Sequence, residues 1–163
     1  MAIRTRVGQG FDIHRFVDGS SDRVLVLGGV KFPGEKPLAG HSDADVIAHA
    51  AADALLGAAA LGDIGMHFPD TDPQWAGADS LTLLAHVAQL VRSAGYEIGN
   101  VDCSIVCEKP KIAPHREAMQ KLLSDAAGAT ITVKGRRAEG LGALGREEGI
   151  ACWAVAVIER TQA

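Results

Sequence analysis

Asp12 and His14 stand two residues apart near the start of the chain, and His49 stands in an alanine-rich segment further on. Side chains alternate between the two faces of a β-strand, so residues two apart point to the same face. One carboxylate and two imidazoles suit Zn²⁺, and three protein ligands leave a fourth position open for catalysis. The three residues predict a zinc site, although an Asp-x-His pair alone is also typical of a solvent-exposed strand end.

Hydrophobic periodicity predicts the elements that must position these residues. The order of strands and helices is typical of a single domain, residues 1–163, with an α+β fold in which a layer of helices covers a sheet. Ser42 is expected to cap the first helix, with Asp45 three residues later. We expect strands at residues 3–14, 24–32, 100–107, 130–134 and 150–159, and helices at residues 43–61, 79–94 and 114–128.

Composition excludes several classes of protein. Hydrophobic residues make up 47% of the 163 residues, which excludes a disordered chain, and the net charge of -4 argues against a nucleic-acid partner. The three cysteines form no C-x-x-C pair, which favours reduced thiols in the cytoplasm. Apolar runs fall short of the roughly 18 residues that span a membrane. We therefore expect a cytoplasmic protein without a membrane partner.

The first predicted helix carries a polar stripe, because Asp45, His49 and Asp53 follow one another at spacings of four. Each step of four turns only about 40° around the helix. A histidine in such a helix is often a core residue, but here carboxylates flank it. Metal-bound histidines usually donate their second ring nitrogen to an acceptor, and we expect Asp45 or Asp53 to be that acceptor.

Three loops could bind parts of a substrate. His41 and Ser42 precede the first helix, whose N-terminus favours an anion such as phosphate. Residues 62–73 carry several carboxylates, which could accept hydrogen bonds from sugar or polyol hydroxyls, although solvated turns have the same composition. Residues 134–146 are rich in glycine and arginine, which suits phosphate. The G-x-G-x-x-G at residues 140–145 precedes a strand, which excludes a dinucleotide fingerprint.

Several of these segments together resemble one family. The strings at residues 41–49, 54–65 and 68–73 closely resemble those of 2-C-methyl-D-erythritol 2,4-cyclodiphosphate synthases, and the string from His41 to Pro73 is highly specific. Residues 10–14, 99–102, 110–111 and 149–151 extend the resemblance over essentially the whole chain.

The resemblance implies both an activity and an assembly. Members of this family convert 4-diphosphocytidyl-2-C-methyl-D-erythritol 2-phosphate into the cyclic diphosphate with release of CMP, in non-mevalonate isoprenoid biosynthesis. They have a mixed sheet and form homotrimers with active sites between subunits. The resemblance also implies that Asp12, His14 and His49 bind Zn²⁺ and that Glu139 contacts Mg²⁺ or Mn²⁺.

The resemblance further implies the substrate contacts. His41 and Ser42 would sit at the phosphates together with Asp12 and His14, and His41 would help to stabilise the transition state. The erythritol pocket would comprise Asp63, Ile64, Gly65, Phe68, Pro69, Asp70, Thr71 and Asp72. The cytosine pocket would comprise Cys107, Glu108, Lys109, Pro110, Lys111, Ile112 and Ala113. The glycine- and arginine-rich segment at residues 134–146, here called the last loop, would contribute Arg136, Arg137, Ala138, Glu139, Ala143 and Arg146.

The last loop departs from the family pattern. Arg136, Arg137 and Ala138 stand where threonines are typical, and Arg137 takes the place of a hydroxyl that stabilises the transferring phosphate. Ala143 replaces a larger side chain, and Glu147 replaces a glycine. The leading interpretation is an active synthase in which Arg137 acts catalytically. A non-catalytic trimer that binds a nucleotide or diphosphate is an alternative, and a phosphatase with a zinc-bound water is another.

Overall fold

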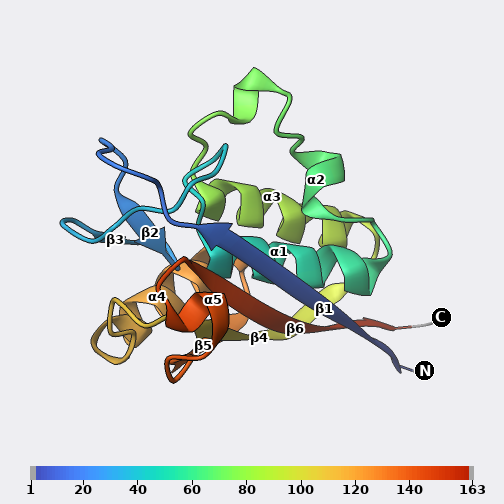
Figure 1. Ribbon diagram of the computed structural model, residues 1–163. Coiled ribbons are helices and arrows are strands. Elements are labelled where there is room, and N and C mark those ends of the chain that lie inside the picture. Colours follow the sequence, from blue (N-terminus) through green and yellow to red (C-terminus); the bar gives the residue numbers. More distant parts are fainter. Residues whose placement is uncertain (1–2, 162–163) are drawn as a thin grey trace.

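The computed structural model describes residues 3–161, which form a four-stranded sheet with helices on one face (Figure 1). The strand order is β1-β6-β4-β5, in which β4 and β5 are parallel and the other neighbours are antiparallel. The sheet is therefore mixed, and the predicted α+β fold is confirmed. The ends of the predicted domain, residues 1 and 163, lie outside the described range. The strands are β1 (Ile3–Arg15), β4 (Glu97–Val106), β5 (Thr130–Arg136) and β6 (Gly149–Thr161).

Three longer helices cover the sheet, and shorter elements connect them. The central helix packs against β1, β6 and β4, and is buried almost all round because small alanines let its neighbours approach closely. The longer helices are α1 (Val46–Ala59), α3 (Ser80–Ser93) and α4 (Arg116–Ala127). The short elements are α2 (Ile64–His67), η1 (Pro73–Trp75), η2 (Ala113–His115) and α5 (Gly142–Gly145). No helix within residues 3–161 is long and apolar enough to cross a membrane.

The segment predicted as one strand at residues 24–32 is a hairpin of β2 (Leu25–Leu27) and β3 (Val30–Phe32). Gly28 and Gly29 make its turn at φ 58° and 77°, a left-handed conformation that glycine adopts without steric cost. Their N–H groups donate to the carboxylate of Asp45 over 2.9 and 2.7 Å. The hairpin is thereby held against the start of α1.

The N-terminus of α1 differs from its prediction. The helix begins at Val46, and its cap is Asp45, whose carboxylate accepts the N–H groups of Ile47 and Ala48 over 3.1 and 3.2 Å. Ser42 lies in the preceding loop and is not the cap. Because a buried carboxylate takes these two N–H groups, they are not free to donate to a phosphate, and phosphate binding at His41 and Ser42 stays a prediction.

Burial alternates along the strands, so the two faces of the sheet differ. Gly8, Gly10 and the three cysteines are buried, and the cysteines are free thiols of the core. The opposite face carries exposed apolar side chains on β1 and β6. These are Val7, Phe11, Ile13, Trp153 and Val155.

The apolar side chains of the third predicted helix, α4, are only partly buried. Met119 and Leu123 are buried on α4, together with Ala127. Ala118 and Leu122 are exposed, because the helix packs against β5, α3 and β3 with its other side.

Candidate functional site

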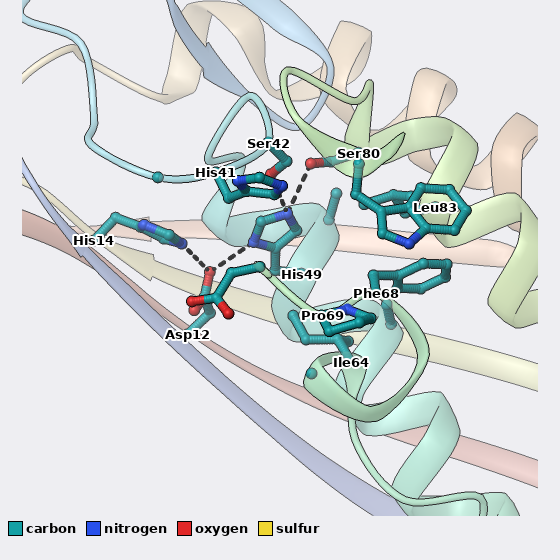
Figure 2. A pocket seen from close by; sticks show the side chains of 16 residues that line it. Asp12, His14, His41, Ser42, His49, Ile64, Phe68, Pro69, Ser80 and Leu83 are labelled. Carbon is teal, nitrogen blue, oxygen red and sulfur yellow. Dashed lines mark hydrogen bonds and ion pairs between the residues drawn. The ribbon is translucent and has the colours of Figure 1, made fainter. Parts of the chain in front are cut away.

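Asp12, His14 and His49 come together where β1 meets α1 (Figure 2). The Oδ2 atom of Asp12 lies 3.2 Å from Nε2 of His14 and 3.1 Å from Nδ1 of His49. One potential ligand atom from each residue lies within 4.8 Å of the others. The pair two residues apart on a strand does share a face, and the helical histidine does reach it, as the sequence predicts.

The sequence around the cluster explains why the two elements meet. Gly8 and Gly10 occupy the same face of β1 as Asp12 and His14, and they lie directly against the alanine-rich surface of α1. A strand normally keeps a helix away by the length of its side chains. Without those side chains, the backbone of α1 approaches β1 and brings His49 to the carboxylate.

The second nitrogen of each imidazole is held by an oxygen atom. Nδ1 of His14 lies 2.6 Å from the carbonyl oxygen of Ala39, and Nε2 of His49 lies 2.8 Å from the hydroxyl oxygen of Ser80. A carbonyl oxygen only accepts, so the outer nitrogen of His14 carries its proton. The inner nitrogen, Nε2, is then the one that faces Asp12 and is left to bind a metal.

The expectation that Asp45 or Asp53 would hold an imidazole is wrong. Asp45 is engaged by the hairpin and the helix cap, and Asp53 accepts the N–H of Ile64 over 3.1 Å. On a helix, residues four apart are neighbours on the surface, but the ring of His49 points away from both carboxylates. The acceptor comes instead from the start of α3.

The electrostatics of the cluster suit a cation. Burial raises the pKa of Asp12, but hydrogen bonds and charge attraction from His14 and His49 outweigh it and bring the pKa to about 2. Burial lowers the pKa of His14, and the hydrogen bond and charge of Asp12 outweigh this and raise it. Three converging donors, with both outer nitrogens held by oxygens, are the ligands that Zn²⁺ prefers. The residues present therefore fit the predicted metal.

A cavity of about 480 Å³ opens beside this cluster. Most of the predicted phosphate and erythritol residues line it, but Asp63, Thr71 and Asp72 do not. Asp63 and Asp72 instead cap short helices, since their carboxylates accept the N–H groups of Met66 and Gln74 over 3.0 Å each. The predicted residues that line the cavity are Asp12, His14, His41, Ser42, His49, Ile64, Gly65, Phe68, Pro69 and Asp70.

Sequence reasoning missed several groups around this cavity. Ser80, Trp75 and Leu83 line the cavity. Arg23 does not line it but holds the loop that carries Ser42. The guanidinium of Arg23 donates to the carbonyl oxygens of Ser42 and Leu38 over 2.6 and 3.1 Å. Neither an arginine in a polar turn nor a serine at a helix start carries a sequence signal of this role.

The residues predicted to bind cytosine form a separate cavity of about 410 Å³. Residues 107–113 line it together with Gly135, Arg136 and Arg137, and Arg116 joins them without having been predicted. Burial raises the pKa of the Cys107 thiol to about 12, and the charge of Glu108 adds to this effect. Cys107 is thus a protonated, apolar part of the wall and not a nucleophile.

Glu108 connects this cavity to the last loop. Its carboxylate accepts the N–H of Ala138 over 2.7 Å and lies 3.4 Å from Nε of Arg137. The predicted residues Ala138, Glu139, Ala143 and Arg146 lie outside both cavities of the single chain. Glu139 is exposed, with a left-handed φ of 54°.

Glu147 has a φ of 59°, which explains why glycine is typical at its position. Its carboxylate lies 3.4 Å from the ammonium of Lys109, and Nε of Arg146 donates to Glu148 over 2.8 Å. The negative charge of Glu147 is therefore directed to Lys109 and not to Arg146.

The fold and the site together define a class of protein: an α+β protein with a carboxylate and two imidazoles at the head of a cavity. The chain belongs to the YgbB family, which it matches over residues 5–159.

Two bacterial relatives are similar over nearly their whole length. The chain is 52% identical to the 2-C-methyl-D-erythritol 2,4-cyclodiphosphate synthase of Geobacillus thermodenitrificans over 161 residues, covering 97% of this chain and 99% of that protein. It is 54% identical to the synthase of the same name from Bacillus cereus over 158 residues, covering 95% and 98%.

Solved structures share the fold. The bifunctional IspDF of Campylobacter jejuni superposes with a TM-score of 0.91 at 36% identity, covering 99% of this chain. This chain spans only 44% of that longer protein. IspF of Plasmodium falciparum, solved as a CDP complex, superposes with a TM-score of 0.82 at 34% identity, covering 97% of both chains.

Proposed function

We propose that this protein is a 2-C-methyl-D-erythritol 2,4-cyclodiphosphate synthase of the non-mevalonate isoprenoid pathway. It converts 4-diphosphocytidyl-2-C-methyl-D-erythritol 2-phosphate into the cyclic diphosphate and releases CMP. Two relatives with this name are 52% and 54% identical to it over nearly the full length. The structural observation that carries the proposal is the cluster of Asp12, His14 and His49 at the head of a substrate-sized cavity.

Asp12, His14 and His49 would hold Zn²⁺, and Glu139 would contact Mg²⁺ or Mn²⁺. When bound, these cations neutralise phosphate charge and polarise the transferring group. The donor set supports zinc, because one carboxylate and two imidazoles with held outer nitrogens are typical of zinc sites. The exposed side chain of Glu139 leaves its carboxylate accessible to a second ion.

The residues around the first cavity bind and orient the erythritol phosphate. His41 and Ser42 lie beside the metal ligands, and Nε2 of His41 lies 3.0 Å from the carbonyl oxygen of Asp72, which fixes its ring. Ile64, Gly65 and the residues from Phe68 to Asp70 form another part of its wall. The substrate supplies its own nucleophile, the 2-phosphate. Holding that group against the β-phosphorus can lower the barrier by about 7–11 kcal/mol through proximity.

The second cavity would bind the cytidine end. Arg136 and Arg137 line it, and several of their N–H groups can donate to phosphate oxygens. The similar Plasmodium falciparum structure is a CDP complex, which supports nucleotide binding by this fold. Arg137 would act on the transferring phosphate together with His41. Because one chain carries the two cavities separately, the complete active site would form between subunits.

The subunits would assemble as a homotrimer through the exposed face of the sheet. Val7, Phe11 and Ile13 on β1 are 65%, 46% and 51% exposed, and Trp153 on β6 packs beside Phe11 at 4.9 Å between ring centroids. Burial of such a face stabilises an assembly by about 25 cal/mol per Å². Light scattering is expected to give three times the chain mass of 17.0 kDa. A monomer would contradict the shared site.

We further propose that the enzyme acts in the cytoplasm, where its free cysteines stay reduced.

A phosphorus NMR time course with the cytidyl substrate, Zn²⁺ and Mg²⁺ tests the activity. Paired cyclic diphosphate signals are expected to appear together with CMP. Tight binding of CMP by the folded, zinc-loaded protein without product would instead support the non-catalytic binding trimer. Release of inorganic phosphate would support a phosphatase. Protein treated with a chelator and reloaded with Zn²⁺ serves as the control for metal dependence.

A further inference from the structure

The outer side of His49 is connected to a second carboxylate through one hydroxyl group. Nε2 of His49 lies 2.8 Å from Oγ of Ser80, and that hydroxyl hydrogen-bonds Oδ1 of Asp43. The other carboxylate oxygen of Asp43 accepts the backbone N–H of Ser80 over 3.0 Å. Ser80 is 1% exposed and His49 is 8% exposed, so water does not compete for these bonds.

The direction of these bonds follows from what each group can donate. An ionised carboxylate only accepts, so the single hydroxyl proton of Ser80 is directed to Asp43. The oxygen of Ser80 can then only accept from the imidazole. His49 therefore carries a proton on Nε2, and Nδ1, which lies 3.1 Å from Asp12, is the nitrogen left to bind a metal.

Ser42 offers a weaker alternative for the same nitrogen. Its hydroxyl oxygen lies 3.2 Å from Nε2 of His49 and also accepts the N–H of Ala44 over 3.2 Å. Its proton is not committed to a carboxylate, so Ser42 could donate or accept. The shorter and committed contact with Ser80 decides the direction.

We propose that Ser80 and Asp43 form a relay that orients His49 and fixes its proton on Nε2, so that Nδ1 is available as a metal ligand. Both are positioning residues, because neither is among the three metal ligands. The relay joins the loop before α1, the helix α1 itself and the first residue of α3, and Figure 2 shows His49 pointing to Ser80 on one side and Asp12 on the other. It deepens the metal site proposed above.

The test removes the hydroxyl with Ser80→Ala and measures Zn²⁺ affinity by competition with a chromophoric chelator. Loss of such an outer partner typically weakens metal binding about 10–100-fold, and we expect a fall in that range. The nitrogen-15 chemical shifts of His49 are expected to show a proton fixed on Nε2 in the zinc-loaded, unsubstituted protein and a more freely exchanging Nε2 proton in the variant. Ser80→Thr, which keeps the hydroxyl, is expected to restore both readouts.

Asp79→Ala is the matched control, because Asp79 caps the same first turn of α3 through the N–H of Leu81 at 2.9 Å without touching His49. It is expected to weaken the helix and leave the Zn²⁺ affinity unchanged. If Ser80→Ala does not fold, Asp43→Asn is measured in the same way, with a smaller fall expected.

Ser80→Ala with unchanged zinc affinity and unchanged exchange of the Nε2 proton would overturn the relay. The nitrogen-15 shifts are also recorded with a chelator present. If the unsubstituted protein does not bind zinc, the proposed metal site fails, whereas exchange of the Nε2 proton of His49 still decides whether the relay exists.

Discussion

A Cβ atom placed on Gly10 would lie 1.9 Å from the carbonyl oxygen of Ala50. No real side chain tolerates such a distance, so β1 and α1 lie at a separation that only glycine permits. Asp12 follows on the same face of the strand, and His49 precedes Ala50 on the helix. The packing of one glycine against one helical carbonyl therefore helps to set the 3.1 Å between Asp12 and His49.

We expect Gly10→Ala to damage both stability and metal binding. The added methyl group meets backbone atoms, which cannot rotate away, so α1 must shift from the sheet. Overpacking of this kind costs about 1–3 kcal/mol or more in the free energy of unfolding, measured by urea denaturation. Zinc affinity should fall because His49 moves with the helix. The control is Gly57→Ala on the exposed side of α1, where a Cβ meets only an atom 3.8 Å away. It should stabilise the helix by about 0.5–1 kcal/mol.

His14→Ala is expected to abolish zinc binding and turnover while the protein stays folded. The imidazole is partly exposed and contributes a ligand atom but little packing, so circular dichroism should be unchanged. Metal content after gel filtration measures the loss. His115→Ala is the control, since His115 packs on Phe32 outside both cavities and should keep a full complement of zinc. Full turnover by zinc-free His14→Ala would refute the assignment of the metal ligands.

The stability of the metal-free protein should depend on Asp12 at acidic pH. Its pKa is about 2 in the folded protein against 3.8 for the free side chain. The folded state thus binds this proton less readily, so the stabilisation is full above about pH 4 and is lost as the pH falls towards 2. A shift of this size corresponds to about 2 kcal/mol.

Asp12→Asn should therefore lower the free energy of unfolding at about pH 5 and have little effect near pH 2. Denaturation in the presence of a chelator measures the difference between the two proteins at each pH. A constant difference across that range would show that the carboxylate is not stabilised by the imidazoles.

We expect the side chain of Arg137 to contribute to kcat. Removing one donor that stabilises a transition state costs on the order of 10²–10³ in kcat, and we expect Arg137→Ala to lie in that range. Arg137→Thr restores a hydroxyl and should retain more activity. Lys121→Ala is a control of similar charge change, because Lys121 pairs only with Asp125 on the surface of α4. Steady-state kinetics on the cytidyl substrate distinguish the variants. If both Arg137 variants had the same kcat as Lys121→Ala, Arg137 would have no part in the chemistry.

The sequence was sufficient to predict that Asp12, His14 and His49 come together as candidate metal ligands, and it predicted most of the helices and strands. Alternation on a strand places Asp12 and His14 on one face whatever the fold, and the helical period of the alanine-rich segment is local too. It was insufficient for the hairpin at residues 24–32. A continuous apolar pattern does not reveal that Gly28 and Gly29 turn the chain to satisfy a buried carboxylate.

The capping of α1 shows the same limit. Ser42, Asp43 and Asp45 are all acceptable caps by residue type, and the choice depends on which carboxylate the hairpin and α3 approach. The prediction that Asp45 or Asp53 holds His49 is wrong for the same reason. The acceptor is Ser80, which stands 31 residues from His49 in the chain.

The sequence by itself determined the residue types that can bind a metal, the periodicity of the elements and the family to which the chain belongs. Only the tertiary structure decided which oxygen holds each imidazole, which carboxylates become caps, and that the two cavities lie apart in one chain. The physical reason is the sequence separation over which each effect acts, because strand alternation and the helical period involve residues only a few positions apart. Hydrogen bonds across the fold depend on where packing places groups that are distant in sequence.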